Sequence, residues 1–270
     1  MKRIISYRGG VSKVFDLAAG LVLAAALVGA EARAENSSAK YCVVDLMEGA
    51  KSVKYLDAPP AGGFDTDEYK TTKIVLQRVD AGSVKNDDGE RISVSKPFYI
   101  GLFKITQSQW QTITGDWPSY FDNALGAVDG ISYDMIRGKT DGSKWPESAD
   151  VDPASFLGLL RQLTDVAFDL PTEAQWLVAF EAKNTGKCSS DLNCGWEWCR
   201  DWYAAALPSG KDFAGAASGI SRVMRGGVWD CMTGMPAVLP RGNFVPSASF
   251  YYFCNLDFGF RLVAPCPEKD

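Results

Sequence analysis

The sequence predicts an α+β domain that is rich in loops, and three observations lead to this fold class. Segments with the two-residue alternation of strands occur toward both ends of the chain, while segments with helical spacing lie between them. No strand–helix–strand rhythm repeats, which favours α+β over a parallel sheet. The 26 glycines and 8 tryptophans are typical of a fold in which loops are held by large aromatic anchors.

The first 34 residues have the pattern of a secretory signal peptide. Basic residues open the chain, the apolar run Leu17–Ala30 follows, and Ala32–Ala34 has the small-x-small pattern of a cleavage site. The apolar run is short for a membrane span, and an N-terminal membrane anchor is the alternative. We therefore expect cleavage near Ala34, export to the periplasm, cell surface or medium, and no stable membrane span afterwards.

The elements after the signal peptide follow from local patterns. Residues 35–71 are expected to form an N-terminal extension, which ends in a loop because Pro-Pro and Gly-Gly occur within 57–70. Residues 73–84 alternate apolar and polar side chains and predict a strand followed by an Ala-Gly turn. Residues 96–105 are aromatic and β-branched and predict a second strand.

Three helices are expected in the middle of the chain. Thr106 is followed three residues later by a glutamine, as is Thr172, and this spacing is that of a capping box at a helix start. A third helix is expected around 153–163, and the Gly115–Phe121 stretch reads as a turn.

The last third of the chain predicts short strands at 195–203, 221–229 and 258–263. In the first of these, Trp196 and Glu197 are neighbours and should therefore point to opposite faces of the sheet.

Net charge and histidine content exclude several function classes. The chain has a net charge of −5, and the predicted signal peptide removes more basic than acidic residues. An acidic surface without a basic run argues against a nucleic-acid partner. The chain has no histidine, which excludes Ser-His-Asp and Cys-His nucleophiles, HExxH metalloproteases and His-ligated zinc or copper.

Seven cysteines follow the predicted signal peptide, and an odd count leaves at least one thiol unpaired within a monomer. They are Cys42, Cys188, Cys194, Cys199, Cys231, Cys254 and Cys266. Export makes disulfides permissible. The second, third and fourth lie close together in sequence, so we expect a local bridge among them.

Seven segments in order resemble the sulfatase-modifying-factor family, whose best-known members are the formylglycine-generating enzymes. They read FYIGLFKITQSQW, GDWPSYF, LPTEAQWLVAF, WEWCRDWY, SRVMRGGVW, RGNFVP and GFRLV, and they span roughly residues 73–264. The resemblance implies an irregular, loop-rich fold related to C-type lectins, formed by residues 72–270.

The resemblance also identifies the positions at which the family holds a copper ion. Formylglycine-generating enzymes hold Cu(I) with two cysteines five positions apart, and Cys231 matches the first, whereas Pro236 stands at the second. Cys231 is therefore the candidate catalytic thiolate, with a remnant or a disulfide partner as the alternative interpretation. Met232 and Met235 leave an altered copper site open, although methionine usually fills gaps in a core. We expect no intact Cu(I) cofactor.

One further family position concerns calcium. Glu197 stands where the family has a glutamate that serves as a Ca²⁺ ligand, so it is the candidate metal residue of this sequence. The alternative is a structural glutamate that faces solvent.

The stretch 243–258 is the candidate recognition loop, because C-type-lectin-related folds present their C-terminal loops as a binding face. Four consecutive aromatic residues there cannot all point into one core, and exposed aromatic groups mark interaction sites. A buried strand followed by a bulge is the alternative. The candidate ligand-binding residues are Phe250, Tyr251, Tyr252, Phe253 and Asn255.

Three functions follow from these expectations. The first is an exported, non-catalytic module that binds a protein, a peptide or a glycan. The second is a copper-dependent oxidoreductase that converts a cysteine of exported sulfatases to formylglycine. The third is a hypervariable binding protein of a diversity-generating retroelement, since similar domains occur in those systems.

Overall fold

The computed structural model describes residues 38–48, 52–86, 88–139, 149–184, 195–227, 241–248 and 258–267. Residues 40–266 form one compact unit, and the ends of the chain, 1–39 and 267–270, form another. The signal peptide and its cleavage site lie outside the described residues. Within the described residues, no helix has the length and apolar character needed to span a membrane.

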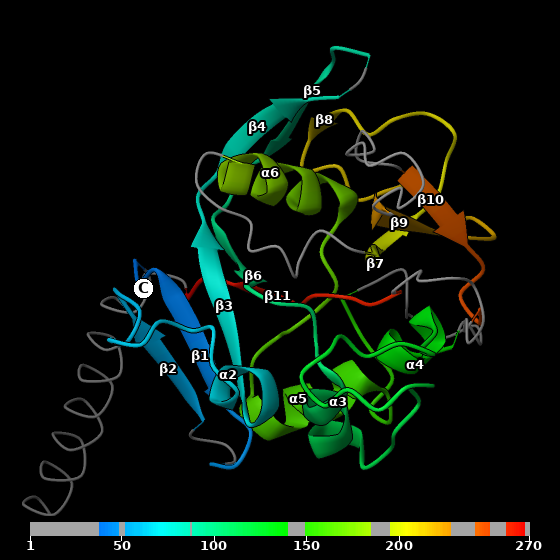
Figure 1. Cartoon of the computed structure of the whole chain (residues 1–270). Coiled ribbons are helices and arrows are strands. Elements are labelled where there is room, and N and C mark those ends of the chain that lie inside the picture. The colour runs from blue at the N-terminus through cyan, green and yellow to red at the C-terminus, as the bar shows by residue number, and fades with distance from the viewer. Residues whose placement is uncertain are drawn as a thin grey trace, which may run out of the picture. The chain divides into compact units, whose positions relative to one another are not determined.

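The largest sheet joins both ends of the compact unit (Figure 1). Its strands are all antiparallel to their neighbours, in the order β11-β6-β3-β1-β2. They are β1 (Tyr41–Asp45), β2 (Val53–Leu56), β3 (Lys73–Val79), β6 (Phe98–Gly101) and β11 (Val263–Pro265). β1 and β2 come from the segment expected to be an extension, so this segment is an integral part of the sheet.

Two smaller sheets carry the remaining strands. One has the order β10-β9-β7 and comprises β7 (Gly195–Trp202), β9 (Arg222–Gly227) and β10 (Arg241–Phe244). The other has the order β4-β5-β8 and comprises β4 (Gly82–Lys85), β5 (Arg91–Val94) and β8 (Gly210–Lys211). The strand predicted over 73–84 is confirmed up to Val79, and the chain then enters β4 as the first arm of a hairpin.

Five helices are present in the described residues: α2 (Glu68–Thr71), α3 (Gln107–Thr114), α4 (Tyr133–Arg137), α5 (Phe156–Thr164) and α6 (Glu173–Asn184). Both predicted capping boxes are confirmed. The Thr106 hydroxyl accepts from the Gln109 amide at 3.2 Å, and the side chain of Gln109 accepts from the Thr106 amide at 2.9 Å. Thr172 and Gln175 make the same reciprocal pair at 3.1 and 2.9 Å.

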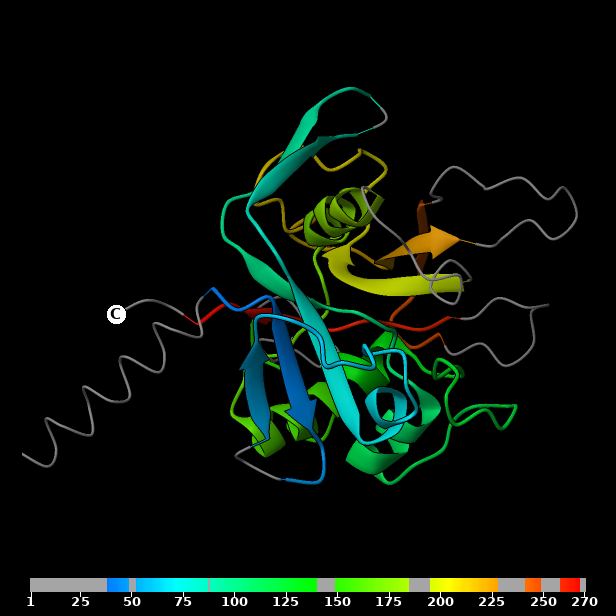
Figure 2. The ribbon, with the colours of Figure 1, turned by 60° about the vertical axis from the view of Figure 1, so that its left-hand side comes forward.

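The main core lies between one face of the large sheet and the helices α3 and α5 (Figures 1 and 2). Trp110 of α3 stacks on Phe156 of α5 with ring centroids 4.9 Å apart, and Phe260 meets Phe156 edge to face at 5.2 Å. A second apolar cluster joins α6 to β4 and β5 through Val178 and Ile92. These contacts place the first turn of α6 next to β7 and β9, where the charged groups of the candidate site gather.

Candidate functional site

The β7–β9–β10 sheet holds the residues that precede and follow segment 228–240, which contains Cys231. Gly195, which follows segment 185–194, pairs with Gly227, which precedes segment 228–240. Gly226 has a φ of +105°, and a Cβ on it would lie 2.5 Å from the Gly195 carbonyl oxygen. Only glycine fits this close approach of two strands.

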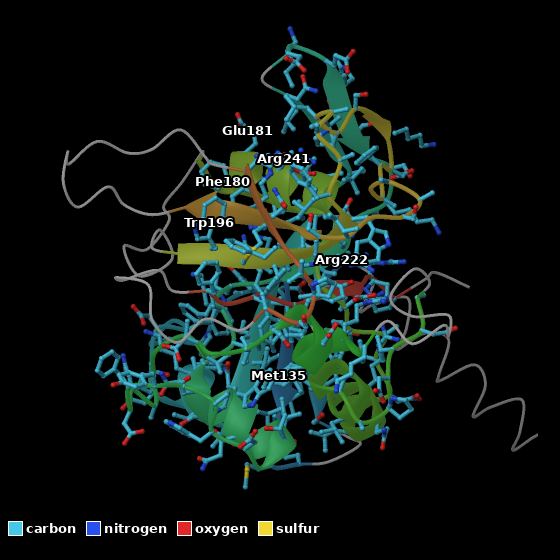
Figure 3. The ribbon with its side chains drawn as sticks, turned by 90° about the vertical axis from the view of Figure 1, so that its right-hand side faces the viewer. Met135, Phe180, Glu181, Trp196, Arg222 and Arg241 are labelled. Carbon is cyan, nitrogen blue, oxygen red and sulfur yellow. The ribbon has the colours of Figure 1, made fainter. Side chains whose placement is uncertain are left out.

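The candidate recognition segment leaves from the same sheet. Phe244 at the end of β10 contacts Phe258 edge to face, with centroids 5.3 Å apart, and these two residues flank segment 249–257. Figure 3 shows Trp196 and Arg241 near Phe180 and Glu181. These residues come from β7, β10 and α6, which lie next to one another there.

A buried ion-pair cluster ties both sides of segment 228–240 to α6. We call Glu173, Arg225 and Arg241 the Glu173 cluster. Glu173 Oε1 accepts from Arg225 Nε at 2.7 Å and from Arg241 Nε at 2.6 Å, while Oε2 accepts from Arg241 Nη2 at 2.9 Å. Glu173 is fully buried, and both arginine side chains are nearly so. A single carboxylate therefore anchors the chain on both sides of this segment.

Aromatic and backbone contacts complete the cluster. The Arg241 guanidinium lies 4.5 Å from the centroid of the Tyr203 ring, and its Nη1 donates to the carbonyl of Ala204 at 2.6 Å. A guanidinium held by a carboxylate, a ring and a carbonyl has a fixed orientation. The anchor is rigid for that reason.

Asp201 lies directly beside this cluster. Its Oδ2 accepts from the Glu173 amide at 2.8 Å, so it caps the first residue of α6. Its Oδ1 is buried and has no hydrogen-bond partner among the described residues. Burial raises the pKa of Asp201 to about 7, and the negative charge of Glu173 contributes to this rise. The hydrogen bond from the Glu173 amide opposes it.

The raised pKa of Asp201 predicts a loss of stability as pH rises. The folded protein binds a proton at Asp201 more tightly than the unfolded chain, so this contribution is complete below about pH 4 and disappears as pH rises through 7. We expect the urea midpoint of the wild type to fall between pH 5 and pH 8 more steeply than that of Asp201→Asn. Parallel profiles for the two proteins would contradict the assignment.

Glu197 is buried and ion-paired, so the expectation that it faces solvent is wrong. It is 2% exposed, and its two oxygens each accept from Arg261 at 2.5 Å. Trp176 Nε1 donates to Oε2 at 2.9 Å. Burial acts to raise the pKa of Glu197, but the Arg261 charge and its hydrogen bonds outweigh burial and lower the pKa to about 2.

Calcium at Glu197 stays a prediction. Both oxygens of this carboxylate are used by donors, and Lys104 adds a further positive charge nearby. The described residues contain no group of three or more His, Cys, Asp or Glu side chains that could hold a metal ion.

The other predicted site residues fall outside the described residues. These are Cys231, Met232, Met235, Pro236, Phe250, Tyr251, Tyr252, Phe253 and Asn255. The contacts described above lie on either side of them. Arg225 and Arg241 bracket segment 228–240, and Phe244 and Phe258 bracket segment 249–257.

The described cysteines are free thiols. Cys199 is buried and unpaired, so the local bridge expected among three cysteines does not include it, and its two sequence neighbours in that trio lie outside the described residues. Burial, followed by the charges of Asp201 and Glu173, raises the pKa of Cys199 well above its usual value. Burial likewise raises the pKa of Cys42 to about 12. Thiols of this kind are unreactive because the thiolate is the nucleophile.

Sequence reasoning missed the Glu173 cluster. Its signal was present, since Glu173 is the only charge in the LPTEAQW motif and each arginine stands in a short Arg-Gly motif. A charge inside an otherwise apolar or glycine-rich motif is a candidate for a buried pair. The partners themselves, 52 and 68 residues from Glu173, could not be chosen from the sequence.

Comparison with known proteins rests on structure alone. No protein-family model matches the sequence, and no curated protein matches it. The structure is similar to PvdO from Pseudomonas aeruginosa with a TM-score of 0.53 at 14% identity, covering 71% of this chain and 94% of PvdO. The chain shares the fold of PvdO. The small sheets and few helices of the chain are consistent with the α+β class, and the likeness fits only loosely the expected formylglycine-generating-enzyme-like, C-type-lectin-related fold.

A second solved structure was also found. Treponema denticola variable protein 1 gives a TM-score of 0.49 at 22% identity, covering 73% of this chain and 96% of that protein.

Proposed function

We propose that this chain is an exported binding module that uses the C-type-lectin-like scaffold to present recognition loops to a protein, a peptide or a glycan. The observation that carries the proposal is that Glu173 holds Arg241 at the start of β10, while Phe244 at the end of β10 contacts Phe258 on the far side of segment 249–257. A rigid scaffold that holds the bases of its loops is the usual arrangement for recognition by loops.

The charged groups next to these loops support binding over catalysis. Glu173 and Glu197 use both of their oxygens in ion pairs, and the Cys199 thiol is buried. These groups are thus employed in holding the scaffold. In our proposal Phe250, Tyr251, Tyr252, Phe253 and Asn255 make the ligand contacts, because rigid aromatic side chains give large contact area at low entropy cost.

The proposal is tested by selection with and without the aromatic residues. Residues 35–270 are screened against a glycan array and a displayed random-peptide library. A variant with serine at 250–253 is screened in parallel, and Ile220→Ser, which removes an exposed apolar side chain elsewhere, is the matched control. We expect ligands that bind the wild type and the control but lose affinity at least about tenfold in the loop variant.

Two results would overturn the binding-module proposal. One is a set of ligands that bind the loop variant as well as the wild type. The other is conversion of a sulfatase-type cysteine peptide to formylglycine in the presence of Cu(I), abolished by Cys231→Ser. That second result would establish the oxidoreductase in its place and give Met232 or Met235 a role as a copper ligand.

A further inference from the structure

A second surface with the properties of an interaction site lies in the loop between α3 and α4. We call residues 115–126 the aromatic loop. Phe121 is 72% exposed, Tyr120 52% and Leu125 39%, and they are among the few large apolar side chains that the described residues expose to this degree. The Tyr120 and Phe121 rings meet edge to face with centroids 4.7 Å apart. Neighbouring exposed apolar groups of this kind mark interaction sites.

The aromatic loop is held in place by hydrogen bonds from both sides. The amide of Tyr120 donates to Asp129 Oδ1 at 3.2 Å, and the amide of Asn123 donates to Gln107 Oε1 at 2.9 Å. The Ser108 amide donates to the carbonyl of Ala124 at 3.1 Å. The rings are therefore presented by an ordered backbone, and a partner pays little to order this surface on binding.

The charges of the aromatic loop indicate the chemistry of the partner. Asp116 and Asp122 are exposed within the loop, Asp129 lies half-buried beneath it, and residues 115–129 contain no lysine or arginine. A second copy presenting the same loop would place carboxylates against carboxylates, since a two-fold contact brings one patch against itself. Anionic lipid is disfavoured for the same reason. A segment with lysine or arginine beside an apolar side chain complements both features.

We propose that the aromatic loop is a docking surface for a basic protein segment whose apolar side chain packs on Tyr120 and Phe121. Asp116 and Asp122 pair with its lysine or arginine residues. This site is additional to the proposed recognition loops and does not depend on them.

The test is a displayed random-peptide library selected on the intact mature chain, with selected sequences resynthesised and measured by fluorescence anisotropy. Three variants are compared: Tyr120→Ser with Phe121→Ser, Asp116→Asn with Asp122→Asn, and Ile220→Ser as the control. The first two variants each change two exposed side chains. Circular dichroism melts confirm that each variant is folded.

We expect a class of selected peptides that carry lysine or arginine next to a large apolar residue. The aromatic variant should weaken their binding by about tenfold or more. The charge variant should weaken it less and reduce its salt dependence, whereas the control and the variant with serine at 250–253 should leave it unchanged.

Several outcomes would overturn this proposal. They are a selection that yields no basic–apolar peptide, peptides that bind the aromatic variant undiminished, and stronger binding to vesicles of phosphatidylglycerol than to any selected peptide. Peptides lost only with the variant at 250–253 would support the proposed function and reject the second surface, so the two proposals fail separately.

Discussion

Replacing Glu173 by glutamine should destabilise the protein by roughly 3–5 kcal/mol, because it leaves two buried arginines without their counter-charge. Glu173 accepts from both Arg225 and Arg241, and all three side chains are removed from water. Domains of this kind are stable by roughly 5–15 kcal/mol, so the loss is a large fraction of the total. The measurement is equilibrium urea unfolding at pH 7.

The matched control for this variant is Glu181→Gln on the same helix. Glu181 is exposed, so the same chemical change there should alter stability by less than about 0.5 kcal/mol. If the two variants unfolded at the same urea concentration, the Glu173 cluster would not stabilise the scaffold. A folded Glu173→Gln protein that still bound every selected ligand with wild-type affinity would also argue against a role of this cluster in holding the proposed ligand-binding segment.

Breaking the Glu197–Arg261 pair from either side should be comparably costly. Glu197→Gln and Arg261→Met each leave one buried polar partner unmatched, at a cost of roughly 3–5 kcal/mol. Residues in direct contact are not additive, so the double variant should lose less than the sum of the two losses. Urea unfolding of the four proteins closes the double-mutant cycle, and additive losses would contradict the pair.

The same pair predicts an acid-dependent loss of stability that is opposite in sign to that of Asp201. The pKa of Glu197 is held at about 2 when folded against 4.5 normally, so its contribution is present above pH 4.5 and is lost as pH falls through 2. Wild type and Glu197→Gln should therefore converge in stability as the medium is acidified over this range. A chelator should leave the wild-type midpoint unchanged, whereas a calcium-dependent rise absent from Glu197→Gln would make this residue a metal ligand.

The local sequence determined where the helices α3 and α6 start. A capping box needs only a threonine and a glutamine three residues apart. Thr106 and Thr172 therefore predict the starts of α3 and α6 whatever the rest of the chain does. The capping boxes depend on neighbours within one turn of chain, and the sequence contains those neighbours directly. At Gly226 the space is limited instead by the Gly195 carbonyl on the neighbouring strand.

Tertiary structure alone decided which distant groups meet. The segment at 41–56 reads as an extension, yet β1 pairs with the edge of β3 and β2 pairs with β1, so both strands complete the large sheet. From the sequence Glu197 reads as a solvent-facing residue or a metal ligand, and only the fold brings Arg261 to it from 64 residues away. A buried charge requires a partner, but the sequence does not show which residue it is, because the packing of the whole chain decides which groups meet.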